Sequence, residues 1–70
     1  MDNLLLIQLG SRIRDIRMQK NMTQKKLAIE CEFENASMSR IETGQTNLTF
    51  RTLYKICEAL DINISDLFKD

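Results

Sequence analysis

Apolar residues recur along this chain at intervals of three and four positions, which is the spacing of one face of an α-helix. The first such stripe contains Leu6, Leu9, Ile13 and Ile16. Thr23, Thr49 and Ser65 precede later stripes and are suited to cap the starts of helices. The pattern predicts five helices, at about residues 4–19, 24–31, 35–43, 49–60 and 65–69.

The predicted helix at about residues 35–43 has one apolar side and one polar side. Met38 and Ile41 lie on the apolar side, and Gly44 follows the helix as its C-terminal cap. The polar side carries small or hydrogen-bonding groups, which are Asn35, Ala36, Ser39, Arg40 and Thr43. A short helix of this kind, braced by the helix just before it, suits insertion into the major groove of DNA.

The remaining apolar positions predict the core of an all-α domain, since the chain has no proline and few glycines. The second helix turns Leu27, Ala28 and Cys31 inward, and Phe33 fills the core beneath the next corner rather than stacking on a base. The inner face of the fourth helix is formed by Phe50, Leu53, Ile56, Cys57 and Leu60. At the end of the chain, Ile64, Leu67 and Phe68 form either the closing layer of the core or a self-association patch.

Length and charge limit what the chain can do. With 70 residues it forms one domain over residues 1–70. A domain this small buries only about 60% of its unfolded surface, so a partner subunit is an expected source of stability. The formal charge is zero, but six basic and three acidic side chains give residues 1–30 a charge of +3. This division is consistent with one positive face or simply with solvated helix surface.

The side chains present exclude several kinds of site. There is no histidine, and Cys31 and Cys57 lie among apolar neighbours, where buried free thiols are expected. No activated nucleophile, phosphate loop or metal constellation is present, so we expect no enzyme activity, no metal, no cofactor and no small-molecule ligand. The apolar opening is too short to cross a membrane and lacks the charged start of a signal peptide, which favours a cytoplasmic protein.

Six motifs resemble the Xre/Cro family of phage-repressor-like helix-turn-helix proteins. They are IRDIR at 13–17, TQKKLA at 23–28, SRIETG at 39–44, NLT at 47–49, LYKICEALDI at 53–62 and DLF at 66–68. Together they extend over about residues 9–68, so the match is far more specific than an isolated short motif. The resemblance implies a five-helix, lambda-repressor-like domain whose second and third helices form the helix-turn-helix.

The resemblance also implies which residues contact double-stranded DNA. Those facing base edges are Asn35, Ala36, Ser37, Ser39 and Arg40, and those contacting the backbone are Gln24, Thr43, Gln45, Thr46 and Asn47. The residue types suit these roles, because arginine bonds guanine, asparagine pairs with adenine, and a methyl group meets that of thymine. Arg17, at the edge of the first apolar stripe, and Glu42 match an ion pair that some family members form.

The chain departs from the family pattern at four positions. Where the family usually has glycine, this chain has Asn21, Glu32 and Asp61, and Glu32 is the least suited of the three to a left-handed conformation. Glu34 takes the place of a serine or threonine cap. Its charge favours the helix N-terminus but repels DNA phosphates unless the carboxylate accepts from a cytosine amine.

The leading hypothesis is a sequence-specific transcriptional regulator acting as a homodimer on an inverted repeat, with recognition helices ~34 Å apart. The expected dimer interface lies around Ile62, Ile64, Leu67 and Phe68. Restriction-modification controllers, small phage-type repressors and stand-alone regulators share this short form, and an antitoxin-type partner is an alternative. Another alternative is a protein-interaction adaptor that does not bind DNA, which the zero charge and the acids beside the third helix motivate.

Overall fold

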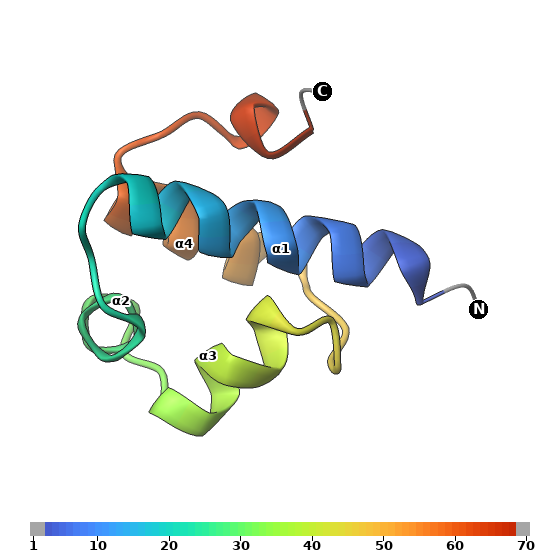
Figure 1. The fold of residues 1–70 in the computed structure, drawn as a ribbon, viewed down its shortest axis with the longest axis horizontal. Coiled ribbons are helices and arrows are strands. Elements are labelled where there is room, and N and C mark those ends of the chain that lie inside the picture. Colours follow the sequence, from blue (N-terminus) through green and yellow to red (C-terminus); the bar gives the residue numbers. More distant parts are fainter. Residues whose placement is uncertain (1–2, 69–70) are drawn as a thin grey trace.

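The computed structural model describes residues 3–68, which form four α-helices and one 3₁₀-helix (Figure 1). These elements are α1 (Leu4–Gln19), α2 (Gln24–Glu30), α3 (Asn35–Glu42), α4 (Phe50–Leu60) and η1 (Ile64–Phe68). The all-α prediction is confirmed, and each α-helix begins and ends within one residue of its predicted position. Over the described range, no helix is long and apolar enough to cross a membrane.

Threonine side chains cap the starts of α2 and α4, as predicted. Thr23 Oγ1 accepts a hydrogen bond from the backbone N–H of Lys26 at 3.0 Å, and Thr49 Oγ1 accepts one from Thr52 at 3.1 Å. Each bond satisfies an N–H group that has no partner within its own helix. A cap of this kind stabilises a helix by about 1 kcal/mol, so the two threonines fix where α2 and α4 begin.

Each α-helix is followed by a left-handed residue, and the N–H groups of this residue and of the next one donate to carbonyls in the last turns of the helix. These residues are Asn21, Glu32, Gly44 and Asp61, with φ of 57°, 61°, 75° and 57°. After α2, the Glu32 N–H donates to the Ile29 carbonyl and the Phe33 N–H donates to the Ala28 carbonyl. Three of these four turns therefore form without glycine, although a left-handed glutamate costs roughly 1 to 2 kcal/mol.

The predicted fifth α-helix is instead the 3₁₀-helix η1, which begins at Ile64 rather than at 65. Its predicted end, residue 69, lies outside the described residues. The Asp66 N–H donates to the Asn63 carbonyl at 2.9 Å, and Asp66 Oδ2 accepts from the Asn63 N–H at 3.0 Å. Hydrogen bonds between residues three positions apart are typical of the tighter 3₁₀ geometry. The side chain that bonds at this turn is that of Asp66 and not that of Ser65, which was the predicted cap.

The core lies between the four α-helices and is closed by η1. Its largest fully buried side chains are Ile13, Leu27, Met38, Ile56 and Leu60. α3 packs against both α1 and α2. The backbones of α1 and α3 lie close together at Gly10, where an added Cβ would lie 2.3 Å from the carbonyl oxygen of Ile41. A glycine is therefore required at this crossing.

The predicted inner faces of α2 and α4 are confirmed, except at Phe50. Leu27, Ala28, Cys31, Leu53, Ile56, Cys57 and Leu60 are all buried. Phe50 is 69% exposed, because it is the first residue of α4 and lies at the edge of the apolar stripe. In η1, Leu67 is buried and closes the core, whereas Phe68 is 60% exposed. Leu67 thus belongs to the closing layer of the core, and its predicted part in a dimer interface stays a prediction.

Both cysteines are free and buried, as predicted. Burial raises the pKa of the Cys31 thiol to about 11, and burial also raises the pKa of Cys57. Thiols with raised pKa values stay protonated at neutral pH, where they are poor nucleophiles and poor metal ligands. The two residues act as small apolar side chains of the core.

Candidate nucleic-acid interface

The corner between α2 and α3, residues 31–34, sets the angle at which α3 is presented. The two backbone hydrogen bonds around Glu32 close it. Beneath it, Phe33 is half-buried and packs against the core, with Lys55 Nζ 5.7 Å from the ring centroid. Phe33 is therefore a core residue, as predicted. Leu27 and Met38 are fully buried on the two helices that the corner joins, so α3 keeps one face free for solvent.

The outward face of α3 carries most of the residues that were predicted to contact bases. Asn35, Ala36, Ser39 and Arg40 are exposed. Ser37 is half-buried and lines a groove of about 220 Å³, together with Phe33 and the loop after α3. At about 100° per residue, Ser37 lies about 200° around the helix from Asn35, and so it faces this loop instead.

The loop at residues 45–49 follows the C-terminus of α3. Gln45 and Asn47 are exposed, and Thr46 is half-buried. The Thr43 hydroxyl donates to the Ser39 carbonyl at 2.9 Å, at the end of the helix. Because this bond uses its only donor hydrogen, Thr43 would have to break it in order to donate to a phosphate. Within residues 3–68 the side-chain amides of Gln45 and Asn47 have no hydrogen-bond partner, so these two residues are better suited to that contact.

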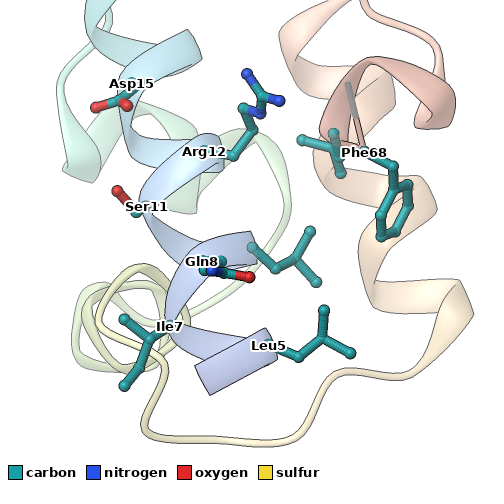
Figure 2. Close-up of a pocket in the computed structure, with 9 residues that line it drawn as sticks. Leu5, Ile7, Gln8, Ser11, Arg12, Asp15 and Phe68 are labelled. Carbon is teal, nitrogen blue, oxygen red and sulfur yellow. The ribbon is translucent and has the colours of Figure 1, made fainter. Parts of the chain in front are cut away.

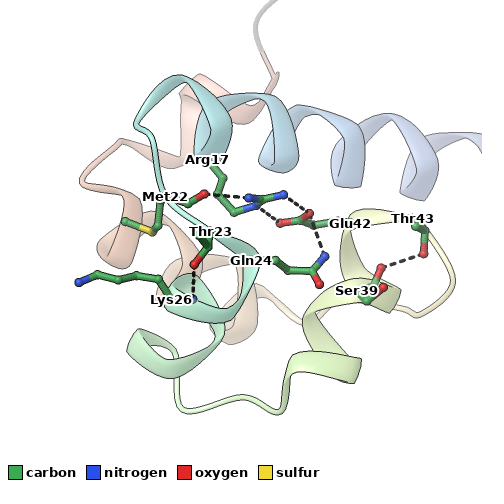
Figure 3. Close-up of polar contacts among 8 residues, drawn as sticks. All are labelled: Arg17, Met22, Thr23, Gln24, Lys26, Ser39, Glu42 and Thr43. Carbon is green, nitrogen blue, oxygen red and sulfur yellow. Dashed lines mark hydrogen bonds and ion pairs between the residues drawn. The ribbon is translucent and has the colours of Figure 1, made fainter.

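A buried ion pair ties α3 to α1 (Figure 3). Arg17 Nε lies 2.7 Å from Glu42 Oε2, and Arg17 Nη2 lies 3.1 Å from Glu42 Oε1, so the pairing is bidentate. The side chains are only 11% and 2% exposed. Arg17 Nη1 also donates to the carbonyl of Met22 at 2.8 Å. The pair thus fixes the C-terminal end of α3 against both α1 and the segment before α2.

Gln24 joins the same network from the first position of α2. Its Nε2 donates to Glu42 Oε1 at 3.2 Å, as the dashed line in Figure 3 marks. Among the residues described, no buried side-chain nitrogen or oxygen lacks a hydrogen-bond partner. One carboxylate on α3 therefore holds side chains from both α1 and α2, and this network connects the helix-turn-helix to α1.

Charges of both signs surround the start of α3. Lys25 and Lys26 are exposed on α2, and Lys26 Nζ lies 3.6 Å from Glu30 in an exposed pair that contributes little. Glu32 and Glu34 are exposed at the corner. Glu34 is the N-cap residue of α3, but its side chain makes no capping hydrogen bond. On DNA, its carboxylate would either repel the phosphates or accept a hydrogen bond from a base.

The residues predicted for the dimer interface lie in two separate grooves. Ile62 and Ile64 line a groove of about 610 Å³ along α4, beside the exposed side chains of Phe50 and Tyr54. Phe68 lines a groove of about 550 Å³ between η1 and α1, opposite Leu5 (Figure 2). The sequence prediction did not place Phe50 or Tyr54 on this surface, although their spacing of four residues puts them side by side on a helix.

The two-faced α3, its corner with α2 and the buried brace define a helix-turn-helix DNA-binding domain. The family model of the Cro/C1-type HTH DNA-binding domain matches residues 12–70, and the chain belongs to this family. The resemblance drawn from the sequence motifs is confirmed. The chain is a DNA-binding transcriptional regulator of this family, which is not a family of enzymes.

Individual relatives cover nearly the whole chain. It is 38% identical to the control protein C.BamHI of Bacillus amyloliquefaciens, over 96% of this chain and 84% of that protein. The fold is similar to that of the restriction-modification controller protein C.AhdI from Aeromonas hydrophila, with a TM-score of 0.87, 32% identity, and 90% and 96% of the two chains covered. It is also similar to the clp gene regulator ClgR from C. glutamicum, with a TM-score of 0.90, 28% identity, and 93% and 84% covered.

Proposed function

We propose that this protein binds an inverted repeat in DNA as a homodimer and controls the genes of a restriction-modification system. The outward face of α3 carries the proposal, because four of its exposed residues offer groups suited to base edges while the opposite face is buried in the core. The similarity over most of the chain to the restriction-modification controller protein C.AhdI, and to the control protein C.BamHI, supports the biological role.

In the proposed complex, α3 lies in the major groove and its exposed side chains meet base edges. Arg40 bonds guanine O6 and N7, Asn35 pairs with adenine, and the methyl group of Ala36 contacts that of thymine. Ser39 adds a hydroxyl group to this face. Ser37 offers its hydroxyl group from the side of the helix that faces the loop after α3. Gln24, Gln45 and Asn47 donate to phosphates on either side of the groove, and Thr43 and Thr46 lie next to them.

Arg40→Ala is expected to weaken binding to the preferred sequence by about 1 to 3 kcal/mol and to relax the preference for guanine at one position of each half-site. Gln24→Ala should instead weaken all sequences to a similar extent, since a phosphate contact carries no sequence information. The measurement is a selection from random DNA at moderate salt, followed by affinities for the selected site and for single-base changes.

Arg14→Ala is the matched control, since it removes the same charge from an exposed position on α1, outside the helix-turn-helix. Its base preferences should equal those of the wild type. If the wild-type protein selected no sequence from random DNA, the proposal would be refuted. Equal base preferences for Arg40→Ala and the wild type would remove Arg40 from the set of base contacts.

The α4 groove is the proposed dimer interface. It combines Ile62 and Ile64 with two exposed aromatic side chains, Phe50 and Tyr54, which are 69% and 54% exposed. Aromatic residues are enriched at interfaces and often carry much of the binding energy. Across a two-fold axis each of these side chains contributes twice. The groove beside Phe68 has one aromatic side chain and is left outside the interface.

Phe50→Ser is expected to raise the dimer dissociation constant more than about tenfold, because it removes an anchor from both subunits. The monomer should keep its stability, as Phe50 is exposed. Sedimentation equilibrium over a range of concentrations measures the effect. Phe68→Ser is the matched control, with a similarly exposed phenylalanine in the other groove. Dissociation by Phe68→Ser alone would place the interface between η1 and α1.

A further inference from the structure

The hydrogen bonds of Glu42 leave the Gln24 amide with one donor still to use. Gln24 Nε2 carries two hydrogens, and one is donated to Glu42 Oε1 at 3.2 Å. Within residues 3–68, the second hydrogen has no protein partner. Gln24 is the first residue of α2 and half-buried, so its inner hydrogen is held by the network while the rest of the amide reaches solvent beside α3.

A glutamine side chain in this position would otherwise rotate freely, and that freedom would be lost on binding DNA. The Glu42 carboxylate prevents the rotation, because it is itself fixed by two hydrogen bonds from Arg17. The guanidinium also balances the negative charge of Glu42. Glu42 can therefore orient a neutral donor next to a phosphate without bringing uncompensated negative charge to that place.

We propose that Glu42 is a positioning residue for DNA binding: it orients the Gln24 amide so that its second N–H meets a backbone phosphate. This inference rests on the proposed DNA complex and assigns the Arg17–Glu42 pair a role beyond stability. Since Glu42 is the last residue of α3 and Gln24 is the first of α2, the phosphate contact and the angle of the recognition helix are set by one group. A shift of α3 would then change both together.

The test replaces phosphates of the selected operator one at a time by methylphosphonate, which is neutral. In the wild type, one replacement per half-site should weaken binding about tenfold through the lost contact with Gln24. Gln24→Ala should be insensitive to that replacement, which identifies the phosphate. The positioning role is then tested in Arg17→Met/Glu42→Leu, which substitutes apolar side chains for the buried pair and so avoids an unpaired buried charge.

The double variant should fold but lose most of its sensitivity at the phosphate that Gln24 contacts, with less than about a twofold effect remaining. Arg17→Met/Glu42→Gln is the rescue variant, because the amide oxygen introduced at position 42 again accepts from Gln24, and it should recover the sensitivity. A folded Arg17→Met/Glu42→Leu protein with the full tenfold effect would overturn the inference. An operator at which no phosphate depends on Gln24 would also overturn it while leaving base recognition intact.

A second measurement needs no substitution. In the free wild-type protein, the NMR order parameter of the Gln24 side-chain amide should approach that of rigid backbone, roughly 0.85. Gln45 is the internal control, since the same side chain is exposed in the loop and should fall below roughly 0.6. Equal, low values for both amides would overturn the positioning role even if the double variants failed to fold. Failure of the proposed function itself appears differently, as the absence of any selected operator.

Discussion

Glu42→Ala is expected to lower the free energy of unfolding by about 3 to 5 kcal/mol. The substitution leaves the Arg17 guanidinium with only its bond to the Met22 carbonyl, in a site where 11% of the arginine side chain is exposed. An uncompensated charge buried in this way is much more costly than the loss of an exposed pair. Urea unfolding monitored by circular dichroism measures the change, and the slope with urea should stay constant.

Glu30→Ala is the matched control for this loss of a carboxylate. Glu30 pairs with Lys26 at 3.6 Å, but the side chains are 39% and 64% exposed, so removing it should cost less than about 1 kcal/mol. Arg17→Met/Glu42→Leu should be more stable than Glu42→Ala, since it leaves no charge behind. Comparable unfolding midpoints for Glu42→Ala and Glu30→Ala would show that the Arg17–Glu42 pair does not stabilise the fold.

The ends of the helices could be predicted because their signals are local. Thr23 and Thr49 act on N–H groups three residues away, and so a short window of sequence contains both partners. The left-handed turn at Glu32 does not follow from the residue type, because glutamate disfavours that conformation. The structure shows that two backbone hydrogen bonds and the packing of Phe33 outweigh that preference.

Errors in the predicted fold arise where burial depends on a neighbouring element rather than on spacing. Phe50 continues the apolar stripe of α4, but it lies at the first residue of the helix, where most of its side chain stays exposed. The sequence pattern of the last helix does not distinguish an α-helix from a 3₁₀-helix, because a segment of five residues forms too few backbone hydrogen bonds. In the structure the segment is a 3₁₀-helix, and the Asp66 carboxylate accepts a hydrogen bond from the Asn63 N–H at its start.

In the candidate interface, too, some features follow from the local sequence and others do not. The exposed positions of Asn35, Ser39 and Arg40 follow from helical periodicity and from the apolar residues on the opposite face. The bond between Gln24 and Glu42 joins residues 18 positions apart, so no local pattern predicts it. Ser37 faces the loop after α3, and the helical pattern alone does not predict where that loop lies.

Gly10→Ala is expected to destabilise the protein by about 3 kcal/mol or more, the upper end for overpacking. A Cβ at this position would lie 2.3 Å from the Ile41 carbonyl oxygen and 2.8 Å from that of Glu42. Both obstacles are backbone atoms of α3, so no side-chain rotation relieves them. The intrinsic helix preference of alanine over glycine, about 1 kcal/mol, opposes the loss but is too small to reverse it.

The alternative to unfolding is that α1 and α3 move apart, which would strain the Arg17–Glu42 pair and displace α3 from its angle to α2. Gly10→Ala should therefore lose DNA affinity even at temperatures where it remains folded. Ser11→Ala, the next residue of α1 but exposed, is the control and should change stability by less than about 0.5 kcal/mol. Thermal unfolding and operator titration together measure both effects. Wild-type stability in Gly10→Ala would mean that α1 and α3 do not cross at this glycine.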